Sequence, residues 1–301
     1  GYNDEQGTLK TTKFERYTMD MSANPKFFDN HLSVNINLKG VINENDFADQ
    51  NKVVEAAAIF DPTKPVYSGV DRFNGYWNWT KQPGIDQVGD PSPEARVNPV
   101  ELLYSSFDTG KTKRSIGNIQ FDYKLHFLTD LRLNLNLGYD VAKGTGEKGP
   151  RINSFMAEKD DTFQGVGRSE YWSKLRRNQL LEFYANYDKN LESIQSRINV
   201  MGGYSYQYFY YSDYNLTYSP VVDGFTANID DGWMLNDEGT KYLRKGAYTI
   251  PSENFLISFY GRANYVFKGR YLLTGTVRRD GSSRFHKDNR WGTFTSVAAA
   301  W

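Results

Sequence analysis

The stretch LRLNLNLGYDV at residues 131–141 decides the fold class. Leucine, tyrosine and valine fill its odd positions, while arginine, asparagine, glycine and aspartate fill the even ones. Because successive side chains of a strand point to opposite sides of a sheet, this pattern predicts a β-strand with one apolar and one polar face. Residues 119–127 alternate in the same way, and only Leu128, Thr129 and Asp130 separate the two runs. Together they predict an antiparallel hairpin over residues 114–141.

The same two-residue alternation recurs along the chain, and no helical stripe long enough for a core helix accompanies it. Nine segments fit a strand, so we expect an all-β fold. Their lengths of about 11 to 18 residues exceed the usual 5 or 6 of soluble sheets and are enough to cross a bilayer at a tilt. Besides the hairpin strands, the segments are 9–23, 31–42, 171–187, 193–211, 255–267, 270–280 and a last strand that begins near Trp291.

The connections alternate between short and long. In an up-and-down antiparallel sheet every second connection lies at the same end, so the pattern predicts one end with short turns and one with large loops. Outer-membrane barrels are built in this way. The short turns fall at 24–30, 128–130, 188–192 and 268–269, and the long loops at 43–113, 142–170, 212–252 and 281–290.

The polar face of the predicted hairpin carries charged and amide side chains at mid-strand, including Asp122, Arg132 and Asn134. A water-filled lumen accommodates such residues, so we expect the other face to contact lipid and aromatic residues at strand ends, such as Tyr139, Trp172, Tyr184 and Trp291, to form interfacial girdles. A soluble β-sandwich that binds glycans stays open as an alternative, and it requires the apolar face to be an internal core. The residues expected against lipid are Ile119, Phe121, Tyr123, Leu125, Leu131, Leu133 and Leu135.

The amino-acid composition argues against several classes of function and of site. The chain of 301 residues has 36 Lys plus Arg against 36 Asp plus Glu, which argues against a nucleic-acid partner because such proteins carry a basic stripe. It has no cysteine, which excludes disulfides and thiolate sites within it. No run of 18 apolar residues and no signal peptide is present.

No motif supports an enzyme. His31, His126 and His286 lie in separate strands or loops without the spacing of a metal site or catalytic triad. The GTGEKG pattern at 144–149 matches a dinucleotide fingerprint but opens no helix, so a flexible loop is expected there. We therefore expect neither a catalytic residue, a cofactor nor a metal. One group of acidic loop residues could hold calcium, but it lacks the D-x-D-x-D-G spacing of a calcium-binding loop: Asp223, Asp230, Asp231, Asp237 and Glu238.

Aromatic residues in the long loops are the candidates for substrate binding: Tyr76, Trp77 and Trp79 in the first loop and Trp233 in the third. An exposed ring can stack on a sugar or grip a peptide side chain. The alternative is loop packing, because a loop of this length needs a small core of its own.

The stretch FYGRANYVFKGRYLLTGTVRRDGSSRFHKDNRWGTFTSVAAAW at 259–301 resembles the barrel of SusC-like (SusC/RagA-type) TonB-dependent outer-membrane transporters. The matching elements are Gly261, Arg262, Asn264 and Tyr265, the run from Arg270 to Leu273, the stretch from Arg278 to Phe285 and the hairpin exit from Asn289 to Gly292. Thr295 departs from the proline that the family often shows. The loop segments 59–67 and 98–103 are similar more loosely, and residues 114–250 agree in pattern only.

The resemblance implies that residues 1–301 are part of one transmembrane barrel of about 22 strands, with the N-terminal plug and TonB-contacting segment outside this chain. It also implies active import of oligomeric nutrients, glycans or in some members oligopeptides, across the outer membrane. The implied partners are a SusD-like surface lipoprotein, the TonB complex and the lipid bilayer. A passive porin-type channel would differ only in sequence beyond this chain.

Overall fold

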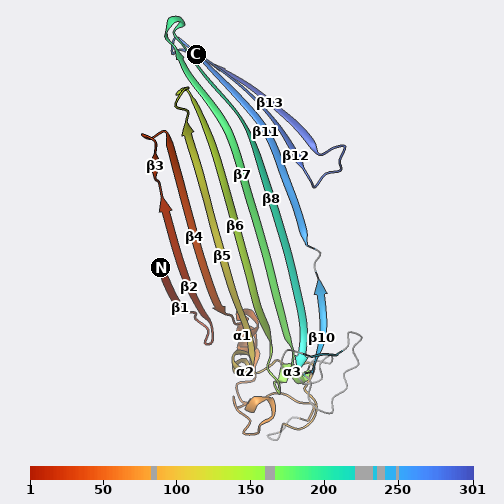
Figure 1. The fold of residues 1–301 in the computed structure, drawn as a ribbon. Helices are drawn as coiled ribbons and strands as arrows, with labels where there is room; N and C mark the ends of the chain where they lie inside the picture. The colour runs from red at the N-terminus through yellow and green to blue at the C-terminus, as the bar shows by residue number, and fades with distance from the viewer. Residues whose placement is uncertain (83–86, 160–166, 221–232, 236–240, 249–250) are drawn as a thin grey trace.

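In the computed structural model, one antiparallel sheet dominates the chain (Figure 1). The structure describes residues 1–82, 87–159, 167–220, 233–235, 241–248 and 251–301. Thirteen strands of these residues belong to the sheet, and its main path runs β1-β2-β4-β5-β6-β7-β8-β11-β12-β13. Neighbours along this path are consecutive in the chain apart from three short side strands, so the topology is up-and-down.

The strands are unusually long. The main path comprises β1 (Tyr2–Gln6), β2 (Lys13–Ala23), β4 (Leu32–Asp46), β5 (Ser106–Lys124), β6 (Leu131–Pro150), β7 (Ser169–Leu191), β8 (Ser196–Pro220), β11 (Ser252–Phe267), β12 (Tyr271–Ser282) and β13 (Trp291–Ala300). The side strands are β3 (Lys26–Phe27), which pairs with β4, and β9 (Trp233–Leu235) and β10 (Lys241–Tyr248), which extend from β8.

Each of the nine predicted segments is a strand, and the all-β prediction is confirmed. The predicted ends of the middle strands are wrong, because β5 begins at Ser106 and β6 continues to Pro150. The GTGEKG segment at 144–149 is therefore strand and not loop, paired with β5 from Thr112 to Phe107. Alternation fades in these extensions, which are rich in glycine, lysine and threonine, as expected where a strand leaves lipid and both faces are wet.

The short connections lie at one end of the sheet and the loop-rich connections with the helices at the other (Figure 1). Lys268 and Gly269 form the predicted tight turn and both have positive φ, which a glycine accommodates without strain. Among the residues that the structure describes, three α-helices lie in the long connections: α1 (Gln50–Ile59), α2 (Pro99–Tyr104) and α3 (Phe155–Lys159). None of the helices described is long and apolar enough to cross a membrane.

The two faces of the sheet have the expected chemistry. Phe121 pairs with Leu135 and Tyr123 with Leu133, while Asp122 pairs with Asn134, so apolar and polar residues form separate rows. Leu125 is the exception among the predicted lipid-facing residues, since β5 ends before it and it belongs to the turn.

Burial is reversed relative to a soluble protein. Asn134 and Ser258 on the polar face are 2% and 5% exposed, whereas Phe183 and Val277 on the apolar face are 43% and 49% exposed. A soluble sandwich would bury the apolar face. The soluble alternative is therefore wrong, and the apolar face is the one that lipid covers.

The predicted aromatic girdle is only partly correct. Tyr184 pairs with Asn134, and Trp172 pairs with Gly146, so both lie on the polar face. A Cβ atom added to Gly144 would lie 3.0 Å from the Trp172 ring, so this ring packs over a glycine-lined part of β6. Tyr139 and Trp291 lie on the apolar face and are 40% and 42% exposed.

Candidate functional site

Amide side chains join the strands across the polar face. Asn264 Nδ2 donates to Asn199 Oδ1 at 3.3 Å, and Asn199 Nδ2 donates to Asn186 Oδ1 at 3.1 Å. Thr274 extends this chain of contacts to β12 by donating to Asn264 Oδ1 at 2.9 Å. Four neighbouring strands thus present a continuous polar surface, which water or a hydrated solute can follow.

Most charges on this face are paired with a charge of opposite sign. Arg114 makes two hydrogen bonds to Asp140, at 2.9 and 2.8 Å, from the adjacent strand. Arg278 lies 2.8 Å from Asp280, and its second nitrogen donates to Ser258 at 3.0 Å. Paired charges of this kind keep a wall polar without giving it a strong net charge.

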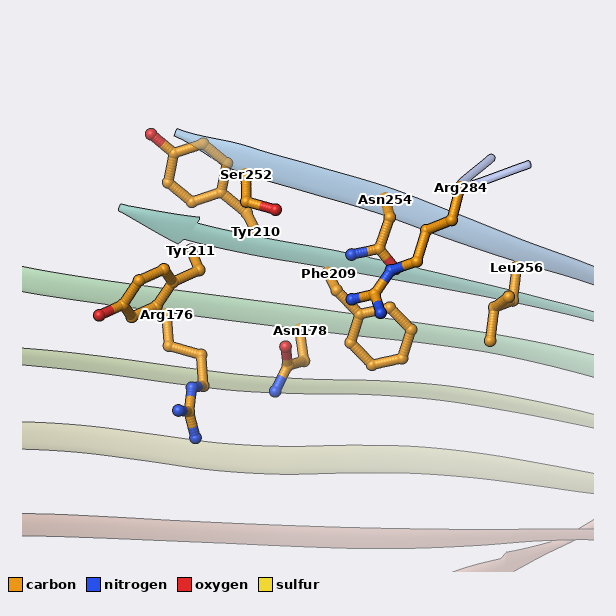
Figure 2. Close-up of a pocket in the computed structure, with 9 residues that line it drawn as sticks. All are labelled: Arg176, Asn178, Phe209, Tyr210, Tyr211, Ser252, Asn254, Leu256 and Arg284. Atoms are coloured by element: carbon orange, nitrogen blue, oxygen red, sulfur yellow. The ribbon is translucent and has the colours of Figure 1, made fainter. Parts of the chain in front are cut away.

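A pocket of about 630 Å³ lies where β7, β8 and β11 face the β12–β13 connection (Figure 2). Strand pairing aligns Asn178 with Phe209 and Phe209 with Asn254, and in the next row Arg176 with Tyr211. These side chains share the polar face of the sheet. Arg284 reaches in from the connection, and Figure 2 shows its guanidinium turned toward Asn254 and Phe209.

The sequence did not identify this pocket. Its residues lie on three strands and one connection that are far apart in the chain, and only the register of the sheet brings them together. One sequence feature could have placed Arg176, Asn178 and Phe209 on the polar face. Each of them occupies a position of β7 or β8 that alternates with the positions of the apolar face.

The predicted aromatic residues of the first long loop lie together. The rings of Trp77 and Trp79 are 4.9 Å apart, and the Lys64 ammonium lies 5.5 and 5.1 Å from their centroids. Tyr76 is 9% exposed and Trp77 4%, whereas Trp79 is half-buried. Loop packing explains the positions of Tyr76 and Trp77, and Trp79 retains ring area that a ligand can contact.

The fourth candidate, Trp233, begins β9, and its backbone pairs with Leu243 of β10. The acidic group at 223, 230, 231, 237 and 238 lies outside the described residues. Two of the three histidines come together at the short-turn end, which their sequence spacing did not indicate. The rings of His31 and His126 stack with centroids 4.0 Å apart, and the Nδ1 of His31 lies 2.8 Å from the Lys124 carbonyl oxygen.

A buried carboxyl ties the large loops to each other. Glu101 on α2 is fully buried, and it accepts hydrogen bonds from Asn78 Nδ2 and from the backbone N–H of Phe155, both at 2.6 Å. The Asn98 side chain caps α2 by accepting from the Val100 N–H at 3.0 Å. Three segments of two different loops therefore converge on one side chain.

Burial raises the pKa of Glu101 to about 7, against the opposing effect of the hydrogen bonds from Phe155 and Asn78. A second link joins the same loops, because Arg72 Nη2 lies 2.6 Å from Glu158 Oε2. The loop end is thus a packed unit, held by polar contacts around the buried rings of Phe73 and Phe155, which lie 5.2 Å apart edge to face.

Comparison with known proteins agrees with this architecture. No protein-family model matches the chain. The TonB-dependent receptor SusC of Bacteroides thetaiotaomicron is 34% identical over 100% of the chain, which spans 29% of that protein. The chain belongs to the SusC-like TonB-dependent receptors. The SusC-like chain is also 26% identical over 83% of its length to TonB-dependent receptor P3 of Formosa agariphila, of which it spans 22%.

Solved structures show the same fold for the SusC-like chain. The RagAB peptide importer in its closed-closed state aligns with 99% of it at a TM-score of 0.67 and 17% identity, over 31% of that chain. The open-open state gives a TM-score of 0.67 and 18% identity, again over 31%. The prediction of a SusC/RagA-type barrel wall is confirmed.

Proposed function

We propose that this chain lines the path by which a TonB-dependent transporter imports an oligomeric nutrient, a glycan, across the outer membrane. The observation that carries the proposal is the chemistry of the two sheet faces. The apolar face is exposed, as contact with lipid requires, and the polar face is bridged by amide side chains from strand to strand. A polar wall of this kind allows hydrated solutes to pass, and it can hydrogen-bond the hydroxyl groups of an oligosaccharide.

A glycan is favoured over an oligopeptide by the rings and amides of the polar-face pocket. Phe209 and Tyr211 offer flat apolar area next to the amides of Asn178 and Asn254. Aromatic faces stack on the C–H face of a sugar, and amides can donate to and accept from its hydroxyl groups. The RagAB relatives are described as peptide importers, so an oligopeptide is the second candidate.

The same architecture supports a proposal about the partners. We propose that a SusD-like surface lipoprotein covers the loop end, where α1, α2 and α3 form a packed surface, and that the TonB complex supplies energy through parts of the protein outside this chain. Trp79 and Trp233 are proposed to contact substrate beneath that partner, while Tyr76 and Trp77 support the loop from within.

Uptake by intact cells tests the proposal. A strain with the full-length transporter should accumulate fluorescent oligosaccharides of the class it recognises, and deletion of its gene or dissipation of the proton gradient should abolish accumulation. Uptake that survives loss of the gradient would indicate a passive channel. Gradient-dependent uptake of oligopeptides alone would replace the glycan with the second candidate.

A further inference from the structure

Two arginines of the polar-face pocket lack the carboxylate partner that three other arginines of this face have. Arg114, Arg132 and Arg278 each have a carboxylate partner on the same face, at 2.8, 3.6 and 2.8 Å. Within the described residues, Arg176 and Arg284 form no ion pair and their guanidinium groups make no hydrogen bond.

The neighbouring carboxylates are already engaged. Asp140, which pairs with Asn178 in the strand register, accepts two hydrogen bonds from Arg114 and another from the Asn178 side chain, and it also interacts electrostatically with Arg176. On the loop side, Asp213 lies 3.6 Å from Lys174 Nζ and accepts a hydrogen bond from the Tyr211 hydroxyl at 3.1 Å. Arg176 therefore shares the single carboxylate of Asp140 with Arg114, and Arg284 forms no ion pair, so the pocket keeps an excess of positive charge.

The two guanidinium groups stand at opposite sides of an aromatic and amide floor (Figure 2). Phe209 lies between Asn178 and Asn254 in the strand register, and Asn254 is only 9% exposed. A guanidinium binds a carboxylate through two parallel hydrogen bonds, which adds geometric selectivity to charge attraction. A flat ring and two amides beside these cations match a sugar ring that carries both hydroxyl groups and a carboxylate.

We infer that this pocket is a specificity site for acidic oligosaccharides, in which Arg176 and Arg284 bind the carboxylates of uronic acid residues while Phe209 stacks on a sugar ring. The inference rests on the proposed import of glycans and names the class of glycan. It predicts that this transporter discriminates by charge and not only by sugar shape.

Calorimetry on the purified full-length transporter tests the inference with tetramers of galacturonate, mannuronate and glucuronate, each compared with its methyl ester. The ester keeps the chain and removes the charge. We expect at least one acid to bind about tenfold or more tightly than its ester, and the difference to shrink as NaCl is raised, since salt screens such contacts. Arg176→Gln and Arg284→Gln should each weaken that acid about tenfold and leave the ester unchanged.

Arg132→Gln is the matched control, because Arg132 lies on the same face but is paired with Asp122 and is remote from the pocket. It should bind the acid as the parent does. Arg114 is unsuitable, since its removal would free Asp140 beside the pocket. Folded variants are confirmed by the heat-dependent mobility of the barrel on gels.

The inference is overturned if no uronate tetramer binds, if acid and ester bind equally, or if Arg132→Gln weakens the acid as much as the pocket variants do. Binding of tetraglutamate without any uronate would overturn it in favour of peptides. If the cell assay shows energised uptake of a neutral glycan while every acid fails here, the inference falls and the proposed import stands.

Discussion

An arginine placed on either face of the sheet at the same depth should have opposite consequences. Leu137 is 37% exposed on the apolar face and pairs with Ile119. Asn118 lies one residue away from Ile119 on the polar face, and it pairs with Gly138, which leaves room for a longer side chain. Leu137→Arg should impair assembly of the barrel, and Asn118→Arg should be tolerated.

The magnitude follows from the position of Leu137 within the apolar run 131–141. At about 3.3 Å per residue and a tilt of about 40°, this run rises roughly 25 Å, which equals the height of the apolar band of such barrels. Leu137 lies near its middle, where an arginine costs about 2 to 4 kcal/mol. This corresponds to about a 30- to 800-fold shift in the folding equilibrium.

Urea titration of the full-length protein refolded into lipid vesicles measures this difference, with tryptophan fluorescence as the signal. Asn134 is unsuitable as the polar-face control despite its register, because it is only 2% exposed and its replacement would also test packing. Equal destabilisation by Leu137→Arg and Asn118→Arg would refute the assignment of the two faces.

Three further outcomes are expected. An epitope tag inserted at Lys268 should stay hidden on intact cells and one at Asn153, an exposed loop residue, should be labelled, and equal labelling would refute the orientation. Because the pKa of Glu101 is raised from 4.5 to about 7, the folded loops hold its proton more tightly than the unfolded chain does. The resistance of these loops to proteolysis should therefore be greatest below pH 4.5 and fall as the pH rises through 7. The Glu101→Gln variant should lose this pH dependence. An unchanged pH profile in that variant would contradict the role of the carboxyl. Trp79→Ala should weaken substrate binding by about 1 to 3 kcal/mol in calorimetry, whereas Trp77→Ala should mainly increase proteolysis of the loop, and the reverse result would exchange their roles.

The strands could be predicted where one face is apolar. In 131–141 each odd residue faces lipid and each even one faces water, so the period of two is visible in the sequence. The same strand continues from Ala142 to Pro150 without that contrast, since both faces are wet there, and the sequence suggested a loop. The strand ends were therefore predictable only where lipid requires a change of polarity.

The site could be predicted less well, for two physical reasons. Tyr76 and Trp77 are aromatic, but composition cannot distinguish a ring that packs a loop from one that binds a ligand; burial does. The pocket around Phe209 depends on the register of three strands, so that Arg176, Asn254 and Arg284 become neighbours only after the sheet forms. The sequence likewise does not identify Glu101 as a buried carboxyl, because its burial depends on contacts from Asn78 and Phe155 in separate segments.

Single-cysteine scanning of residues 131–141 tests the central claim most directly, and the absence of cysteine from these 301 residues makes the background clean within the chain. In the full-length transporter, with any other cysteine replaced, each position is labelled with a charged thiol reagent that stays in water, and then with a fluorophore that brominated lipid quenches. The account predicts that even positions other than the buried Asn134 react with the aqueous reagent and that odd positions are quenched by lipid, with a period of two. Uniform labelling, or aqueous labelling of Leu133, Leu135 and Leu137 with protection of Arg132, Asn136 and Asp140, would contradict it.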